Sequence, residues 1–317
     1  MRVKPPRLRF LLRAVSVAFV LMCCAAHTAM AASIIVVTGE QEGAHQEAMA
    51  ALVEALGPEF GPGDIEVRDT GKLEGIGLGE ARVIVTIGTQ AAKAVAARRT
   101  TAAVLHTLLP RETFEALAAP PNGAKPSAIY LDQPEQRLLA LLATALPGQS
   151  RIALLSGPSS EQRIKRMTTA AGEVRLQVAV ERVEHERDIY PALERLLRDS
   201  PILVAQPDSL VFNSYTIQNI LLTSYRNRAP LIGFSPAYVR AGALLALYST
   251  PAQIGRQAAA AARATLAGRG LPPPQGPREF EVASNPVVAR ALGIVLPSPE
   301  EITARLRERE PTGEVRR

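Results

Sequence analysis

The fold is decided by residues 207–257, PDSLVFNSYTIQNILLTSYRNRAPLIGFSPAYVRAGALLALYSTPAQIGRQ, in which helical and strand patterns alternate. Apolar residues at helical spacing predict helices over residues 215–226 and 251–266, while the short apolar runs at 231–234 and 243–248 predict strands. Strands that alternate with helices of about 10–15 residues indicate a parallel sheet with crossover helices. This stretch therefore predicts one half of an α/β lobe.

The same alternation extends outward to both ends of the chain. Apolar runs before residue 150 predict five strands, and the pattern then restarts with three strands before the stretch quoted above and one after it. These runs are residues 34–38, 65–67, 82–87, 102–105 and 128–131, then 151–155, 176–183, 202–205 and 280–282. Apolar strands without a polar face are covered on both sides. We therefore expect an α/β protein with two Rossmann-like, doubly wound parallel-sheet lobes joined by a hinge.

The first 32 residues predict an export signal. Five basic and no acidic residues precede or flank an apolar run at residues 14–26, and Ala29-Met30-Ala31 offers the small residues that a signal peptidase recognises. Cleavage there removes five positive charges, so the formal net charge falls from +6 to +1. We therefore expect a periplasmic protein without the basic surface that binding to nucleic acid requires.

Cys23 and Cys24 are the two cysteines of the chain, and both lie in this leader. The mature protein would carry no thiol, which suits an oxidising compartment and excludes a disulfide or a cysteine-ligated metal. Two alternatives stay open. An uncleaved anchor would have an apolar core shorter than the roughly 20 residues that a membrane span needs. Lipid anchoring at Cys23 or Cys24 is disfavoured because Leu21-Met22 lacks the usual small residue before the cysteine.

No catalytic motif is recognisable in the sequence. His45, His106 and His185 have no metal-ligand spacing, and the chain lacks a G-x-S-x-G elbow, a Walker A loop and a G-x-G-x-x-G turn. The glycine-rich residues 71–79 lie between two expected strands and precede no helix, so we interpret them as a surface connection. The sequence favours a binding protein that needs no cofactor and no metal.

Candidate ligand-binding residues lie where the expected strands turn into helices, because ligands of open α/β sheets sit outside the carboxyl ends of the strands. The Thr89 hydroxyl could cap a helix or bind an anion. Asp208 could cap the next segment or hold a ligand ammonium, and Tyr238 offers a ring and a hydroxyl. The candidates are Gly88, Thr89 and Gln90 in the first half, and Ser159, Ser160, Asp208, Ser235 and Tyr238 in the second.

Three stretches resemble the ABC-transporter substrate-binding family, which includes periplasmic tryptophan- and phenylalanine-binding proteins. They are the quoted residues 207–257, the ASNPVVARALGIVLP segment at 283–297 and VTIGTQAA at 85–92. The resemblance implies a type I periplasmic-binding fold that captures a small-molecule ligand by hinge closure. It also implies an inner-membrane ABC permease as partner, and a monomer. Thr89, Ser159, Asp208, Ser235 and Tyr238 fall on matching cleft positions.

The resemblance also implies how the lobes divide the chain. A signal peptide would cover residues 1–32, and three crossings near Leu131, Leu247 and Ala283 would join the lobes. Lobe 1 would span residues 33–131 with a return segment at about 248–282, lobe 2 would span 132–247 with a segment at about 283–310, and 311–317 would be a loose tail behind a frayed, exposed helix end.

Two departures from the family pattern affect the expected ligand. The first helix carries Gly43-Ala44-His45 instead of a histidine-proline motif, and residues 105–110, LHTLLP, replace a D-P pair. The first-lobe half of the pocket is therefore altered. The sequence leaves open a solute-binding protein for a small polar ligand, amino-acid-like or otherwise, and an exported sensor or docking protein on the same scaffold.

Overall fold

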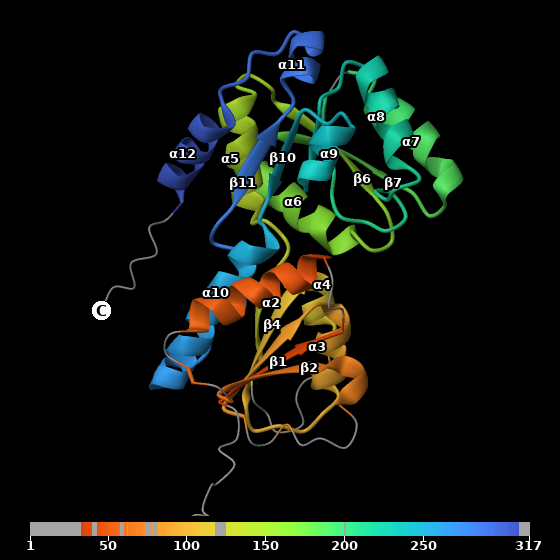
Figure 1. Cartoon of the computed structure of the whole chain (residues 1–317). Helices are drawn as coiled ribbons and strands as arrows, with labels where there is room; N and C mark the ends of the chain where they lie inside the picture. The colour runs from red at the N-terminus through yellow and green to blue at the C-terminus, as the bar shows by residue number, and fades with distance from the viewer. Residues whose placement is uncertain are drawn as a thin grey trace, which may run out of the picture.

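The computed structural model describes residues 33–39, 43–57, 60–61, 63–73, 78, 81–117, 125–199 and 201–310. The expected export signal and the expected loose tail lie outside these residues. The described chain forms two α/β lobes that meet end to end, with three segments passing between them (Figure 1). The two-lobed α/β architecture predicted from the sequence is confirmed.

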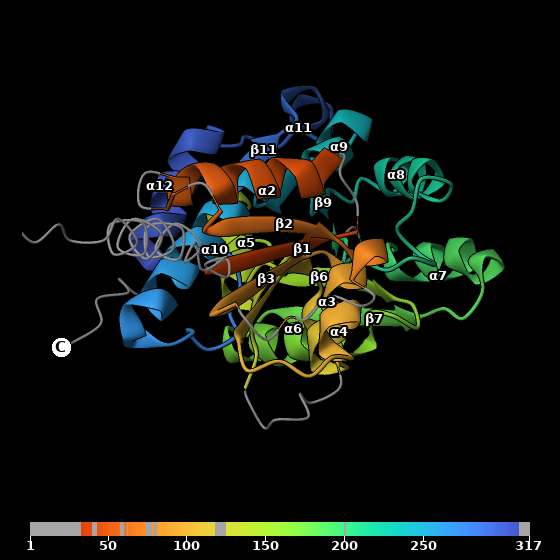
Figure 2. The ribbon, with the colours of Figure 1, turned by 60° about the horizontal axis from the view of Figure 1, so that its bottom comes forward.

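Lobe 1 contains a parallel sheet of order β2-β1-β3-β4-β5. Its central strands are buried along their whole length because helices cover both faces: α2 and α10 pack on one face and α3 on the other (Figure 2). The strands are β1 (Ile34–Thr38), β2 (Ile65–Asp69), β3 (Val83–Ile87), β4 (Ala103–Leu109) and β5 (Ser127–Tyr130). The helices are α2 (Gly43–Leu56), α3 (Thr89–Ala96), the short α4 (Arg111–Glu115) and α10 (Pro251–Ala264).

Lobe 2 contains a sheet of order β11-β10-β9-β8-β6-β7, in which only β11 is antiparallel to its neighbour. Helices α5, α6 and α12 cover one face, and α7 and α8 the other. The strands are β6 (Arg151–Ser156), β7 (Gln177–Arg182), β8 (Ile202–Val204), β9 (Leu231–Gly233), β10 (Leu245–Tyr248) and β11 (Glu281–Ser284). The helices are α5 (Glu135–Ala145), α6 (Glu161–Glu173), α7 (Ile189–Leu196), α8 (Ile217–Arg226), α9 (Pro236–Ala241), α11 (Pro286–Leu292) and α12 (Pro299–Arg309).

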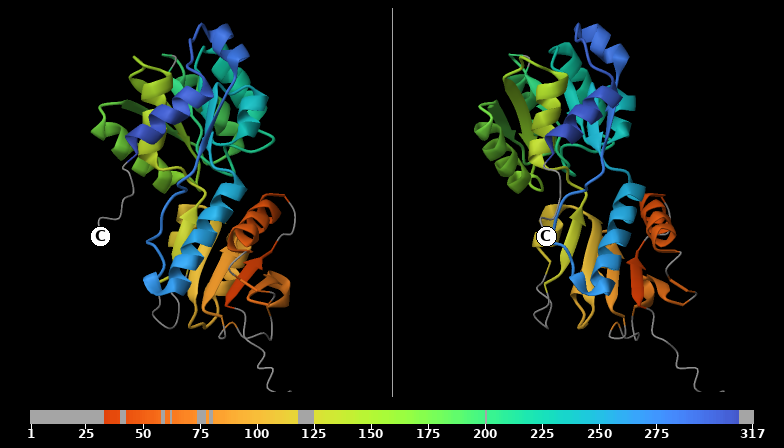
Figure 3. Two further views of the ribbon diagram at one scale, coloured as in Figure 1. Left: turned by 60° about the vertical axis from the view of Figure 1, so that its left-hand side comes forward. Right: turned by 90° about the vertical axis from the view of Figure 1, so that its left-hand side faces the viewer.

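The three crossings between the lobes follow β5, follow β10 and precede β11. After the second crossing α10 returns to lobe 1 and packs against α2 (Figure 3), so closely that a Cβ on Gly255 would lie 2.2 Å from the carbonyl oxygen of Ala48. The third crossing begins after Gln275, which still pairs with Ile129 of β5, and ends before β11. It therefore lies ahead of Ala283, the position that the resemblance implied.

The C-terminal helix differs from the expected frayed, exposed end. A capping box between Ser298 and Glu301 starts α12, and Ile302 and Leu306 are buried one turn apart against α5. Charged residues surround these two apolar positions in the sequence, so the pattern predicts a solvent-exposed helix. Among the described residues, no helix combines the length and the apolar character that crossing a membrane would require.

Candidate functional site

A cavity of about 240 Å³ lies at the hinge between the lobes. Its walls come from the first two crossings, from the carboxyl ends of β8 and β9, and from α5 and α6 of lobe 2. Lobe 1 contributes Pro110, just before α4. Most of the wall is apolar, with Leu138, Met167, Phe234 and Leu247 supplying much of it. A ligand in this cavity would touch the segments that must bend when the lobes move.

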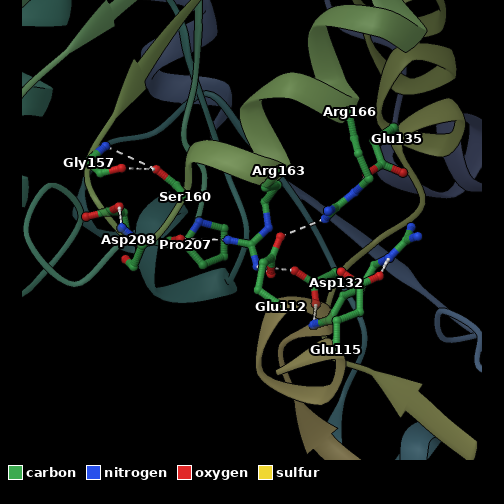
Figure 4. A network of polar contacts seen from close by, with 12 residues as sticks. Glu112, Glu115, Asp132, Glu135, Gly157, Ser160, Arg163, Arg166, Pro207 and Asp208 are labelled. Carbon is green, nitrogen blue, oxygen red and sulfur yellow. Dashed lines mark hydrogen bonds and ion pairs between the residues drawn. The ribbon is translucent and has the colours of Figure 1, made fainter. Parts of the chain in front are cut away.

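One side of the cavity is fixed by Arg163, a buried residue of α6 that is 5% exposed. Its guanidinium donates to Glu112 Oε2 at 2.7 Å, to the Asp132 carboxylate, and to the Pro207 carbonyl at 2.7 Å (Figure 4). Glu112 belongs to lobe 1, Asp132 to the first crossing and Pro207 to the loop after β8. The side chain of Arg163 therefore contacts both lobes and the first crossing.

Arg166, one helical turn further along α6, completes the network. It donates to Glu112 Oε1 at 2.7 Å and to Glu135 Oε1 at 2.8 Å. Partial burial acts to raise the pKa of Glu112, but the charge of Arg163 and the hydrogen bond from Arg166 outweigh it and hold that pKa below its ordinary value. Glu112 is thus an ionised lobe 1 group held by two arginines of lobe 2.

Other polar groups of the cavity wall are also satisfied within the protein. The Gln133 amide donates to Ser249 Oγ at 2.8 Å and accepts from Arg137 at 2.7 Å. The Tyr248 hydroxyl donates to Glu281 Oε2 at 2.9 Å, and burial together with that bond raises the pKa of Tyr248 to about 12. These groups hold the crossings in place and have little hydrogen-bonding capacity left for a ligand.

Gln206 is the exception among the polar residues that line the cavity. It lies two residues after the end of β8 and is 6% exposed. No hydrogen bond to its side chain is present within the described part of the chain, yet its amide atoms are not among the fully enclosed polar atoms. The remaining exposure of Gln206 therefore includes the amide, and Gln206 is one of the residues that line the cavity.

Asp208, two residues further along, binds backbone N–H groups of the protein itself. Its carboxylate accepts hydrogen bonds from the backbone N–H groups of Ser159 (3.2 Å), Leu210 (2.9 Å) and Val211 (3.1 Å). Ser160 is fully buried, and its hydroxyl closes the turn on Gly157 (Figure 4). Asp208 and Ser160 therefore stabilise the two strand-end turns, β6 and β8, against each other.

Tyr238 and Ser235 lie behind the cavity wall. The Tyr238 ring packs against Phe234 with centroids 4.5 Å apart, and its hydroxyl donates to the Phe212 carbonyl at 3.4 Å. Burial raises the Tyr238 pKa. Ser235 is the N-cap residue of α9 but makes no capping hydrogen bond with its side chain.

In lobe 1 the structure places Gly88, Thr89 and Gln90 at the start of α3. Gly88 has a φ of 88°, and a Cβ there would lie 2.6 Å from Nε2 of His45, so the imidazole covers this turn. None of the eight residues predicted from the sequence lines the hinge cavity; Ser159 lines a more open hollow between the lobes, beside Glu112. The ligand contacts of these eight residues stay predictions.

The sequence reasoning identified the strand-end turns but missed the groups that line the cavity. Gln206 precedes the predicted ligand contact Asp208 by two residues, and an uncharged side chain beside an aspartate gives a weaker signal in the sequence. A usable signal was Arg163, which precedes Met167 by four residues and therefore lies on the same face of a helix that must be buried. A charged residue on such a face needs partners, and for Arg163 these are Glu112 of lobe 1, Asp132 of the first crossing and the Pro207 carbonyl.

Comparison with known proteins places the chain in a family. Residues 123–306, more than half of the chain, match the family model described as ABC transporter substrate binding protein. The protein belongs to this family. The match covers nearly all of lobe 2, the crossings and every residue of the cavity wall except Pro110. No curated protein sequence matches the chain.

Solved structures share the fold at low sequence identity. The ligand-free, open substrate binding protein with adhesive properties from Clostridium difficile is 17% identical, with a TM-score of 0.68 over 85% of this chain and 97% of that one. An ABC domain from Streptococcus pneumonia in complex with L-Trp is 15% identical, with a TM-score of 0.59 over 87% and 98%. A conserved domain protein from Vibrio cholerae is 19% identical, with a TM-score of 0.59 over 86% and 98%.

Proposed function

We propose that this substrate-binding protein is the exported, non-catalytic component of an ABC-type uptake system. It captures a small polar ligand between its lobes and presents it to an inner-membrane permease as a monomer. The observation that carries the proposal is the hinge cavity, whose wall includes both the first and the second crossing. A ligand held there contacts the segments that bend, so its binding free energy favours one arrangement of the lobes.

The proposal includes the location and the division of the chain inferred from the sequence. The leader at residues 1–32 would be removed on export to the periplasm. Residues 33–131 and about 248–282 would then move as lobe 1, against lobe 2 at 132–247 and about 283–310. Intact-mass measurement of the protein recovered from the periplasm tests the cleavage near residue 32.

A thermal-shift screen tests ligand capture. The full chain would be expressed with its leader, and the protein purified from the periplasm would be screened against amino acids, small peptides, sugars, nucleosides and small amides. A ligand at 100 times its dissociation constant adds about 2.7 kcal/mol of stability, which is readily detected as a higher melting temperature.

A matched pair of variants locates the site of any hit. Leu138→Trp puts a large ring into the cavity wall, whereas Leu222→Trp makes the same change on α8, where the side chain is 47% exposed. We expect Leu138→Trp to abolish the shift and Leu222→Trp to retain it. No shift with any compound would contradict the proposal and favour the exported sensor or docking role.

A further inference from the structure

We infer that the small polar ligand of the hinge cavity is uncharged: its polar head is an amide-like group that pairs with the side chain of Gln206, and the rest of it is an apolar ring. The inference rests on the proposed function and specifies the chemical class of the ligand. It follows from what each polar group of the cavity wall already binds.

Each charged group of the wall already has an ion-pair partner. Arg163 is paired with Glu112 and Asp132, and Glu135 is paired with Arg166. Asp132 also accepts from the backbone N–H of Arg111 at 2.7 Å. A charged group that left water for this cavity would find no free counter-charge, and an unpaired charge in an apolar site is costly. An uncharged ligand avoids this cost.

Among the uncharged polar groups of the wall, Gln206 is the one that we assign to ligand recognition. Gln133, Tyr248 and Ser249 are engaged with each other or with the chain around the crossings. The Nε of Arg163 has no partner within the described residues, but it is enclosed by protein and has no access to the cavity. The Gln206 amide combines access to the cavity with the absence of a partner among the described residues.

The loop that carries Gln206 is held rigidly. Pro207 accepts from Arg163 at 2.7 Å, and the Asp208 carboxylate is anchored by three backbone N–H groups. On the other side, Ala205 donates to the Ile232 carbonyl at 2.9 Å. The amide is therefore presented from a fixed backbone, as a specificity contact requires.

The chemistry of a primary amide defines its partner. A glutamine side chain offers an acceptor oxygen and a donor nitrogen side by side, so a group with the same pair, such as a carboxamide or a lactam, can form two hydrogen bonds with it. The rest of the ligand would pack against Met167, Phe234 and Leu247. A volume of about 240 Å³ equals that of roughly eight water molecules, which suits a single-ring compound better than a peptide or a disaccharide.

Four probes of nearly equal shape test this assignment: phenylacetamide, phenylacetate, phenethylamine and L-phenylalanine. They share a benzyl group and differ in the charge and hydrogen-bonding capacity of the head. Dissociation constants would be measured by titration calorimetry, with ligand-observed NMR for weak binders. We expect phenylacetamide to bind at least tenfold more tightly than each of the three charged probes.

Variants of Gln206 test the contact itself. Gln206→Met keeps the length of the side chain but removes its hydrogen-bonding groups. We expect it to lower the affinity for phenylacetamide at least tenfold. Gln218→Met makes the same change on the exposed face of α8 and should leave the affinity unaltered. Melting temperatures of both variants check that they are folded. If Gln206→Met does not fold, Gln206→Glu replaces it, and we again expect a tenfold lower affinity for phenylacetamide.

The outcomes separate this inference from the proposed function. A charged probe, a sugar or a peptide that binds more tightly than phenylacetamide would overturn the inference. If Leu138→Trp abolishes that binding, the proposal of ligand capture at the hinge is still supported. Unchanged phenylacetamide binding in a folded Gln206 variant would also overturn it. Failure of every probe and every screened compound to bind would contradict both.

Discussion

The two lobes present the same kind of edge to each other, the carboxyl ends of parallel strands, but they use it differently. The lobe 2 edge, after β8 and β9, forms one wall of the hinge cavity, alongside the crossings and helices α5 and α6. The lobe 1 edge after β3 is covered by the imidazole of His45, which lies against Gly88. From lobe 1, the cavity receives Pro110, and Glu112 reaches across to α6.

This difference shows that a strand-end turn is only a potential site. The turns at Gly88 and at Asp208 carry similar signals in the sequence, a small or acidic residue between a buried strand and a helix. A side chain from elsewhere in the chain decides whether the turn is open. In this protein we interpret lobe 2 as the lobe that binds and lobe 1 as the lobe that closes.

The largest expected effect tests the structural role of the lobe 2 edge. Asp208→Ala removes the acceptor of three backbone N–H groups from a site that is 4% exposed. Hydrogen bonds to charged groups contribute about 1.5–3 kcal/mol each, so for three of them we expect a loss of about 5 kcal/mol in the free energy of unfolding. Denaturant titration measures it, and Asp199→Ala, at an exposed site, is the control.

Asp208→Asn sharpens this test. The amide oxygen can still accept from Leu210 and Val211, while the new N–H₂ group opposes the N–H of Ser159. We expect about half of the loss seen with alanine. If Asp208→Ala were stable but unable to bind a ligand that the wild-type protein binds, Asp208 would be a ligand contact, as the sequence suggested.

A second prediction concerns a buried polar group of lobe 1. His106 is 2% exposed, its Nδ1 lies 2.8 Å from the Thr86 hydroxyl, and burial lowers its pKa to about 4. The pKa of His106 in the folded state lies below the unfolded value of about 6.5. The contribution of neutral His106 to the free energy of unfolding is therefore fully present above pH 6.5 and declines as the pH falls towards 4.

The corresponding variant should flatten this dependence. A difference of about 2.5 pKa units is worth about 3 kcal/mol, so the wild-type protein should lose up to that amount over this range from His106. His106→Gln removes the titrating group and should reduce the slope of unfolding free energy against pH. His185→Gln, at an exposed position of lobe 2, should leave the slope unchanged. Equal slopes for all three proteins would refute the assignment.

A third prediction tests the closed turn of lobe 1. Gly88→Ala places a Cβ 2.6 Å from the His45 ring on a backbone with a φ of 88°, and we expect a loss of about 2 kcal/mol. Gly172→Ala in α6 is the opposite case, because its Cβ meets nothing within 4 Å, and it should stabilise by about 0.5–1 kcal/mol. The double variant Gly88→Ala/His45→Ala should regain the steric part of the loss. If it regains nothing, His45 does not close the turn.

Much of the fold was predictable because buried strands and amphipathic helices leave periodic patterns. The strand runs 34–38 and 151–155 and the helix 251–266 follow this rule. The site was less predictable, since it depends on contacts between distant residues. Asp208 faces the main chain because Ser159, 49 positions earlier, lies beside it, and that leaves Gln206 facing the cavity. The five-residue helix α4, which carries Glu112 to lobe 2, is too short to leave a periodic pattern.

The smallest expected effect tests the tie between the two lobes. Glu112→Gln removes the charge that Arg163 and Arg166 share. Since Glu112 is partly exposed to solvent, we expect the closed arrangement to lose about 1 kcal/mol, or roughly a fivefold shift toward open lobes. Small-angle X-ray scattering should then give a larger radius of gyration. Glu115→Gln, on the same helix but paired with Arg111 alone among the described residues, should leave the radius of gyration unchanged.

The same contact predicts a pH effect of defined sign. Because the inter-lobe pairing depresses the pKa of Glu112, the closed arrangement is favoured above the ordinary glutamate pKa and loses this contribution as the pH falls through the depressed value. The wild-type protein should therefore expand at acidic pH more than Glu112→Gln does. An equal expansion of both would show that the Glu112 pairing does not hold the lobes together, and would leave lobe 1 without an ionic role in closing the site.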